Sequence, residues 1–295
     1  MWLLFALIAP LFWAAVHVLD EHCVDNILEK PWFGIITSSA ATLVAFLVIP
    51  LLLPFIEWQS LGTKWFLYAI VAGVLIQISQ SFYFTALSYS EAGIVAAYWN
   101  FTPMVLPFAS YYLLGNILSI THYIGIAVLI IASTWIYFLD YDFKTRLNTL
   151  GLMILATLGQ ICLYLIMTIV YKEISYLIAI YGMITGIILS GLSPLIVPKI
   201  RASVLTNLPK LKSNFWFFVY IEVANLIALG SAQLAIKLGD ASLVAAVETT
   251  IPAFTFLLSL GFKAKMKIEQ IITIENLSQK MIVIILMVIG VWLVS

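Results

Sequence analysis

The stretch that decides the fold occurs twice in this 295-residue sequence. The first copy reads Ser90-Glu-Ala-Gly-Ile-Val-Ala-Ala-Tyr-Trp-Asn-Phe-Thr-Pro103, and the second reads Gly239-Asp-Ala-Ser-Leu-Val-Ala-Ala-Val-Glu-Thr-Thr-Ile-Pro252. The copies align without a gap at a constant offset of 149 residues (252 minus 103). In each copy the second residue is acidic and opens the predicted helix, and a proline follows it twelve residues later. Such self-similarity at about half the chain length predicts a protein built from two repeated halves.

The composition places the chain in a membrane. Hydrophobic residues make up 63% of the sequence and charged residues 9%, with a mean hydropathy of +1.10, so there is too little polar surface for a water-soluble globule. We therefore predict an all-α integral membrane protein with ten transmembrane helices, since a span needs ~20 apolar residues. Runs such as Leu43–Leu53 are continuously apolar, which argues against a β-barrel. The predicted spans are residues 2–19, 32–56, 65–88, 92–115, 119–139, 148–170, 175–198, 215–237, 241–262 and 278–295.

The repeat relates span four to span nine, so each half holds five spans. We place the first half at residues 1–140 and the second at residues 148–295. Two sequential copies with an odd number of spans lie in opposite orientations across the bilayer. This inverted arrangement is typical of secondary transporters, whose site lies near the midplane between the halves. The sequence thus predicts alternating access to a small-molecule substrate by a protein whose other partner is the lipid bilayer, as a monomer or homodimer.

The repeated stretch also resembles a known family. The residues Phe84-Thr-Ala-Leu-Ser-Tyr-Ser-Glu-Ala-Gly-Ile-Val-Ala-Ala97, followed by Thr102-Pro103 and Leu113-Leu-Gly115, are similar to the fingerprint of EamA-type carriers in the drug/metabolite transporter superfamily. Residues 235–252 resemble its second copy. The family usually has Gly-Glu after the fourth and ninth helices, whereas this chain has Gly115-Asn116 and Gly261-Phe262. Aligning Trp135 with Trp292 also leaves about eight extra residues before the last span.

The resemblance implies ten helices in two inverted repeats, transport of amino acids or other small metabolites, commonly outward across the inner (plasma) membrane, and no cofactor. It also implies that both termini are cytoplasmic, whereas the positive-inside rule predicts the opposite. Alternate connections between spans lie on the same side of the membrane, and those on one side hold three Lys residues, namely Lys64, Lys172 and Lys237. Those on the other side hold eleven Lys and Arg residues, namely Lys30, Lys144, Arg146, Lys199, Arg201, Lys210, Lys212, Lys263, Lys265, Lys267 and Lys280. We follow the charge count, and interpret residues 199–214 and 263–280 as solvated loops.

Glu248 is the leading candidate for a transport residue. A carboxylate inside a span costs ~2.5–3.5 kcal/mol on insertion scales, so it normally faces a cavity or a partner. Pro252 lies one turn further along and is expected to bend the helix beside Glu248. The alternative is that Glu248 reaches interfacial water or pairs with Lys237. At the same repeat position in span four lie Tyr98, Trp99 and Asn100, which could bind an amine or a planar solute by cation-π contact and stacking, or could be interfacial aromatics.

A polar stripe on span eight gives a second candidate, Glu222. Asn225 and Gln233 follow it on one helical face. The counterpart in span three is Gln77, Gln80 and Phe84, with Tyr83 beside them, although such amides can also serve only as bonds between helices. A carboxylate in a dry site keeps its proton until the cavity hydrates, so Glu248 and Glu222 are both candidates for proton coupling.

Spans one and six supply the remaining candidates. Trp13 and His17 lie one turn apart, and Gln160 and Tyr164 occupy the matching positions in span six. His17 could relay protons. The nearby cluster Asp20-Glu21-His22-Cys23 with Asp25 contains metal-ligand residue types, but no closed ligand spacing, so we interpret it as a solvated turn and predict no metal site. Spans one, three, four, six, eight and nine should surround the cavity, with spans two, five, seven and ten outside.

Other classes of function are disfavoured. No basic run exists that could neutralise a series of phosphates, so nucleic-acid binding is not expected. There is neither a P-loop nor a Ser/His, Asp/Asp or His-Glu-x-x-His constellation, so the chain is not predicted to be an enzyme. The remaining alternative is a flippase for a lipid-linked substrate, or a non-transporting membrane subunit.

Overall fold

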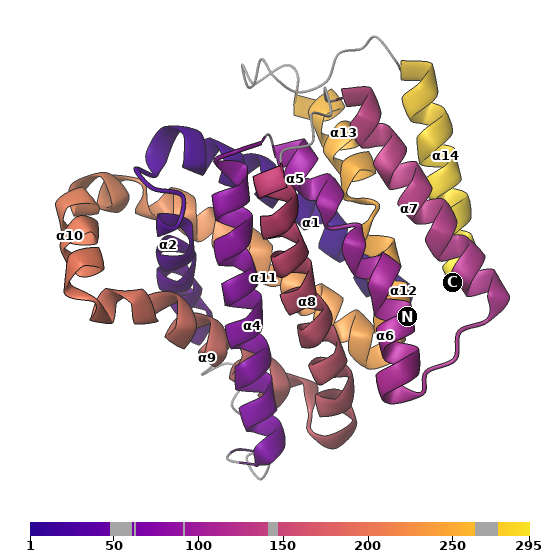
Figure 1. Ribbon diagram of the computed structural model, residues 1–295, viewed down its shortest axis with the longest axis horizontal. Coiled ribbons are helices and arrows are strands. Elements are labelled where there is room, and N and C mark those ends of the chain that lie inside the picture. The colour runs from indigo at the N-terminus through magenta and orange to yellow at the C-terminus, as the bar shows by residue number, and fades with distance from the viewer. Residues whose placement is uncertain (48–60, 62, 91, 141–146, 263–276) are drawn as a thin grey trace.

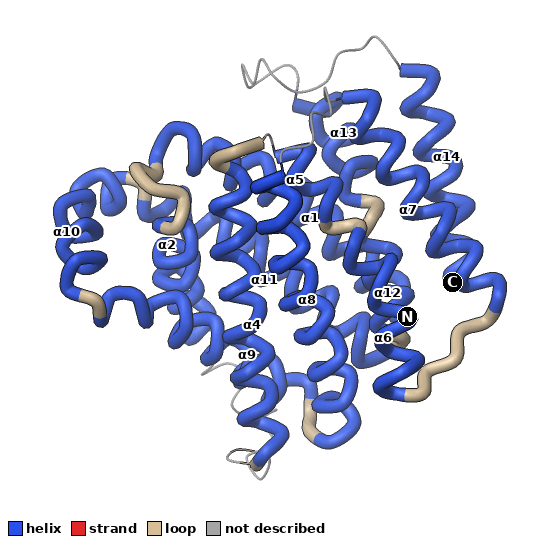
Figure 2. Tube along the Cα trace, in the orientation of Figure 1, coloured by secondary structure: helices blue, strands red, loops and turns tan. Residues whose placement is uncertain are grey.

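The computed structural model describes residues 1–295 except 48–60, 62, 91, 141–146 and 263–276 (Figure 1). All regular elements of the described part are helices, joined by short connections (Figure 2). They are α1 (Trp2–His22), the π-helix η1 (Cys23–Ile27), α2 (Phe33–Thr42), the 3-10 helix η2 (Leu43–Leu47), α4 (Lys64–Leu87), α5 (Ala92–Tyr98), α6 (Phe101–Leu114), α7 (Ile120–Asp140), α8 (Leu147–Glu173), α9 (Tyr176–Leu192), the 3-10 helix η5 (Ser193–Ile196), α10 (Pro198–Ser213), α11 (Phe215–Leu238), α12 (Ala241–Glu248), α13 (Ile251–Phe262) and α14 (Leu277–Val294).

Among the described residues, seven helical segments are long and apolar enough to cross a membrane. They are Trp2–Ile27, Lys64–Leu87, Ile120–Leu139, Leu147–Glu173, Tyr176–Ile196, Phe215–Leu238 and Ala241–Leu258. Two shorter apolar helices cover Phe33–Ala45 and Ser278–Val294, and α5 with α6 covers the fourth predicted span. The prediction of an all-α membrane protein is confirmed, whereas the count of ten spans stays a prediction.

Both copies of the repeat form a helix that is interrupted at the same place. The first breaks between α5 and α6, at Trp99 and Asn100, and the second breaks between α12 and α13, at Thr249 and Thr250. Each proline then falls in the first turn of the following helix, where its missing N–H costs no helical hydrogen bond. The expected bend beside Glu248 is thus confirmed as a full break.

The starts and ends of these helices follow from local chemistry. Asp240 caps α12, because its Oδ1 atom accepts a hydrogen bond from the backbone N–H of Ser242 at 2.8 Å. Gly115 ends α6 with a φ of 70°, a left-handed conformation that glycine adopts without strain. Asn116, which stands where the family usually has Glu, donates to the second oxygen of Asp240 at 3.2 Å. The end of α6 is therefore tied to the start of α12.

Close backbone contact joins α4 to α9. A Cβ atom added to Gly73 would lie 1.9 Å from the carbonyl oxygen of Met183, and one added to Gly186 would lie 2.1 Å from that of Ile70. Small residues permit this close approach. The van der Waals contacts that result hold the helices together in lipid, where the hydrophobic effect does not drive helices to associate. Gly182 lies one turn before Gly186, and a Cβ atom added to it would lie 2.9 Å from that of Ala69, so both glycines serve packing inside this bundle.

Two expectations about the polar connections are wrong. Residues 199–214 are not a loop but lie almost entirely in α10, which is mostly exposed and buries only Val204 and Leu211, two turns apart on one face. Lys280 lies within α14, where it is buried and its Nζ atom is 5.2 Å from the ring centroid of Phe256. Lys144, Arg146, Lys263, Lys265 and Lys267 lie outside the described residues.

Candidate functional site

A central cavity brings together the elements that carry the polar residues of the spans. Its empty volume is about 1290 Å³, open space at the mouth included. Side chains of α1, α2, α4, α8, α11 and α12 line it, together with both helix breaks. Ten of the predicted site residues border it: Trp13, His17, Gln80, Tyr83, Trp99, Asn100, Gln160, Glu222, Asn225 and Glu248. Tyr98 and Tyr164 lie behind the wall.

Glu248 is the last residue of α12, at the point where the second repeat helix breaks. Its side chain is buried, and the hydroxyl of Tyr164 donates to the carboxylate from 2.5 Å. Gln160 donates to the same Tyr164 oxygen at 3.3 Å, and Thr102 donates to Gln160 at 3.0 Å. This hydrogen-bonded chain connects α6, α8 and α12. The alternative that Glu248 pairs with Lys237 is wrong for the described residues. Lys237 is exposed in the last turn of α11 and forms no ion pair with Glu248.

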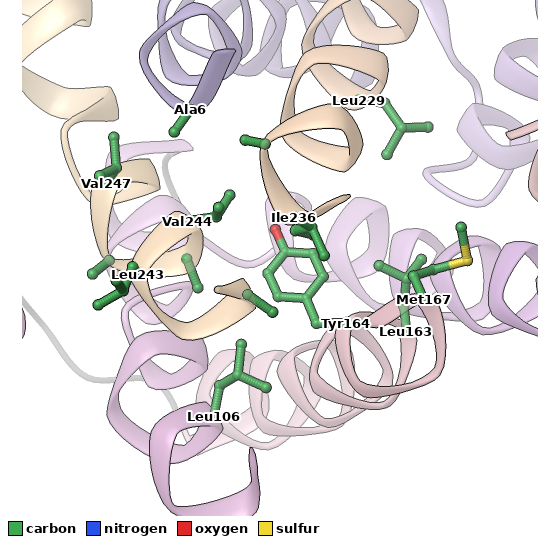
Figure 3. Packing of buried hydrophobic residues seen from close by; sticks show 14 of the residues in the cluster. Ala6, Leu106, Leu163, Tyr164, Met167, Leu229, Ile236, Leu243, Val244 and Val247 are labelled. Carbon is green, nitrogen blue, oxygen red and sulfur yellow. The ribbon is translucent and has the colours of Figure 1, made fainter. Parts of the chain in front are cut away.

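Tyr164 is a support for Glu248 and not part of the cavity surface. Its ring is buried among Leu106, Leu163 and Val244, between α8 and α12 (Figure 3). Apolar packing on the ring fixes the direction of its hydroxyl, so Tyr164 holds the carboxylate of Glu248 in place. Tyr98 is likewise buried behind the cavity, where its ring stacks on Phe101 with centroids 5.8 Å apart.

Glu222 is held by more partners than Glu248. Ser38 donates to one carboxylate oxygen at 2.7 Å, and Thr42 donates to the other at 2.8 Å. Asn225 adds a longer hydrogen bond at 3.3 Å and accepts one from the indole N–H of Trp13 at 3.1 Å. The expectation that span two lies outside the cavity is therefore wrong: Ser38 borders the cavity, and the hydroxyls of α2 bind Glu222. Spans five and seven also reach the cavity, through Tyr137 of α7 and Ile187 of α9.

Three aromatic side chains form one wall of the cavity. The rings of His17 and Tyr83 lie 5.7 Å apart between centroids, and those of Tyr83 and Trp99 lie 6.0 Å apart. Tyr83 also donates a hydrogen bond of 3.3 Å to Asp20. The structure thus brings one ring from each of spans one, three and four into one row.

Asp20 is a site residue that the sequence reasoning missed. It is buried at the cavity wall with Cys23, so its interpretation as part of a solvated turn is wrong. The signal that could have found it is spacing, because Asp20 follows Trp13 and His17 at intervals of seven and three residues, on the same helical face. Among the described residues, no three His, Cys, Asp or Glu side chains are placed to hold a metal ion.

The amides of the predicted stripe, and Asn100 of span four, take different roles. Asn100 borders the cavity but donates to Ser133 at 3.1 Å and Thr134 at 3.2 Å. Gln77 donates to the backbone of Ile35 and to Ser39, so it joins α4 to α2. Gln233 is buried away from the cavity and accepts a hydrogen bond from Tyr171 at 3.0 Å. Gln77, Gln80 and Asn225 all border the cavity, but the amides of Gln77 and Asn225 are engaged with neighbouring helices, so Gln80 is the amide of the stripe with the most direct access to a solute.

Comparisons with known proteins agree with this architecture. Residues 1–138 match the model of a family described as "EamA-like transporter family". No curated protein matches the sequence. One solved structure, titled "Crystal structure of protein", has a TM-score of 0.68 and 14% sequence identity, and the match covers 100% of this chain and 95% of that chain. At that identity the likeness shows the fold alone.

Proposed function

We propose that this chain, which its residues 1–138 place in the EamA-like transporter family of the drug/metabolite transporter superfamily, is a secondary carrier for a small polar solute. The match confirms the family resemblance noted in the first copy of the repeated stretch, and the family together with the apolar helices supports a multi-pass membrane transporter. The finer proposal is that the solute is an amino acid or a related amine or aromatic compound, that it moves outward across the inner (plasma) membrane, and that protons drive it.

The single observation that carries the proposal is the cavity between the two helix breaks. Both breaks expose polar or aromatic side chains to it, Trp99 and Asn100 from the first and Glu248 and Thr249 from the second. Interrupted helices of this kind typically build the substrate site of secondary transporters. A cavity of about 1290 Å³, open space at its mouth included, has room for a small metabolite.

Helix packing supports the two inverted halves. α1 packs against α11, and α4 packs against α8. These helices are spans one and eight in the first pair and spans three and six in the second. If each span is exchanged for its counterpart in the other half, one for six and eight for three, the first pair becomes the second. The same exchange leaves the pair α7 and α14 unchanged, and these two helices pack along each other (Figure 1). Alternating access then follows from a rocking of the two halves about the shared cavity.

Glu248 is the residue through which we propose proton coupling. It has one hydroxyl donor in the structure and lies where α12 ends, so a small movement of α13 would change its access to water. Glu222 is the second candidate, since its carboxylate borders the same cavity.

The test is efflux from proteoliposomes that are loaded with a mixed metabolite pool and subjected to a pH gradient. We expect mass spectrometry to detect selective efflux of one solute class, faster with the gradient than without it. Glu248→Gln should lose the response to the gradient, since an amide cannot exchange a proton. Normal, gradient-dependent transport by this variant would contradict the coupling. Failure of the folded protein to move any soluble compound would favour a lipid-linked substrate or a non-transporting subunit.

A further inference from the structure

The cavity wall carries acidic groups without basic ones. Asp20, Glu222 and Glu248 all border the cavity and are all buried. No Lys or Arg side chain is among the described residues of the wall, and His17 is the one imidazole there. Buried carboxylates that lack a basic partner are costly unless they are neutralised by protons or by a bound cation. The wall is therefore suited to a positive charge.

A solute carboxylate would find few donors in this cavity. The indole N–H of Trp13 is engaged with Asn225, the amide of Asn100 with two hydroxyls of α7, and the amide of Gln160 with Tyr164. Gln80, Trp99 and His17 offer N–H donors that carry no full charge, and such donors compensate a desolvated carboxylate beside like charges only weakly. The zwitterionic part of an amino acid thus fits the wall less well than an amine does.

The helix breaks do not supply an anion site in place of basic residues. At the start of α6, the N–H of Thr102 is bonded to the carbonyl of Trp99, and Pro103 has no N–H. At the start of α13, the N–H of Thr250 is bonded to the carbonyl of Val247, and Pro252 again lacks a donor. A helix start binds anions through its unsatisfied N–H groups, and here the groups beside the first helical residue are used or missing, which leaves a single candidate donor at each start, Phe101 or Ile251.

We infer, on the basis of the proposed carrier function, that the solute is an organic cation without a carboxylate: a primary amine joined to a planar or aromatic body. The ammonium group binds at the acidic side chains, and the body stacks on the row His17, Tyr83 and Trp99, whose neighbouring centroids lie 5.7 and 6.0 Å apart. This narrows the proposed substrates by excluding free amino acids.

The test uses two pairs of compounds that differ by one carboxylate: tyramine with tyrosine, and agmatine with arginine. Purified full-length protein in detergent is titrated with each compound by isothermal calorimetry, and uptake of each is measured in proteoliposomes. We expect each amine to bind at least about tenfold more tightly than its amino acid, because the amino acid must bury an unpaired carboxylate. Both amines should bind, because the ring of tyramine and the planar guanidinium group of agmatine can each stack on the aromatic row.

Variants show whether the acidic wall causes this preference. Glu248→Gln and Asp20→Asn should each reduce the preference for tyramine over tyrosine by about threefold or more, since each removes one repulsive charge. Glu173→Gln is the matched control, because Glu173 is exposed at the end of α8, outside the cavity, and should leave the ratio unchanged.

Two outcomes would overturn the inference in different ways. Tyrosine binding as tightly as tyramine, with measurable transport of both, would remove the cation preference and leave the carrier function intact. Binding and transport of none of the four compounds would overturn the inference too, and the mixed-pool efflux assay then decides separately whether the carrier function also fails.

Discussion

Glu222 and Glu248 border one cavity, but the two carboxylates are held in different ways. Glu222 lies inside the continuous helix α11 and accepts hydrogen bonds from Ser38, Thr42 and Asn225. Glu248 ends the short helix α12 and accepts from Tyr164. A carboxylate with several donors in a continuous helix links neighbouring helices by hydrogen bonds. A carboxylate with a single donor at a helix break can exchange that donor for a solute or a proton. We interpret Glu222 as mainly structural and Glu248 as mainly functional.

The largest expected effect separates the two acids by transport. Glu248→Gln should lower the apparent affinity for the transported amine by about 10- to 100-fold, because hydrogen bonds to charged groups contribute roughly 1.5–3 kcal/mol. Glu222→Gln should lower it by about threefold or less, since its carboxylate is already occupied by hydroxyl donors. The measurement is the concentration dependence of uptake into proteoliposomes. An equal or reversed order of the two effects would remove the assignment of roles.

A second expected effect concerns stability. Tyr164→Phe should cost about 1–3 kcal/mol of folding free energy, because a buried acceptor loses its hydroxyl donor. Ser38→Ala should cost only about 0.5–1.5 kcal/mol, because Glu222 keeps Thr42 and Asn225. Unfolding in mixed dodecyl maltoside and dodecyl sulfate micelles measures both.

The control for this pair is Thr185→Ala. The hydroxyl of Thr185 donates to the carbonyl of Tyr181 in its own helix and touches neither carboxylate. It should therefore change stability by less than either test variant. If Ser38→Ala destabilises the protein more than Tyr164→Phe, the partners of Glu222 are not redundant and the comparison between the two acids must be redrawn.

The fold was predictable from the sequence where a physical signal repeats. Apolar length revealed the helices, and the spacing between an acidic residue and a proline marked both interrupted spans. The helix α10 escaped prediction because four basic residues and two prolines masked its apolar spacing. The burial of Lys280 against Phe256 also could not be foreseen, because a lysine at the edge of an apolar run normally reaches water.

The site was predictable where a charge interrupts an apolar span. Glu222 and Glu248 stand out because carboxylates there are rare and costly. Ser38 and Thr42 give no such signal, since small hydroxyl residues are common in membrane helices and usually bond to their own backbone. Asp20 was missed because four neighbouring polar residues suggested a solvated turn. Tyr164 was predicted to line the cavity, because spacing identifies the helical face on which a residue lies but not the neighbouring helix that covers this face.

The smallest expected effect tests how far the Glu222 network extends. Trp13→Phe removes the indole N–H that donates to Asn225 and keeps an aromatic ring at the cavity wall. Hydrogen bonds between membrane helices contribute about 0.6 kcal/mol on average, so we expect a loss of stability of that size and a change in transport affinity of less than about threefold. A double-mutant cycle with Glu222→Gln measures the coupling between the two positions. A coupling energy near zero would limit the hydrogen-bond network to the direct partners of Glu222. A coupling energy of about 0.6 kcal/mol would show that Trp13 stabilises the carboxylate through Asn225. In that case α1 is linked to the hydrogen bonds that hold α2 against α11.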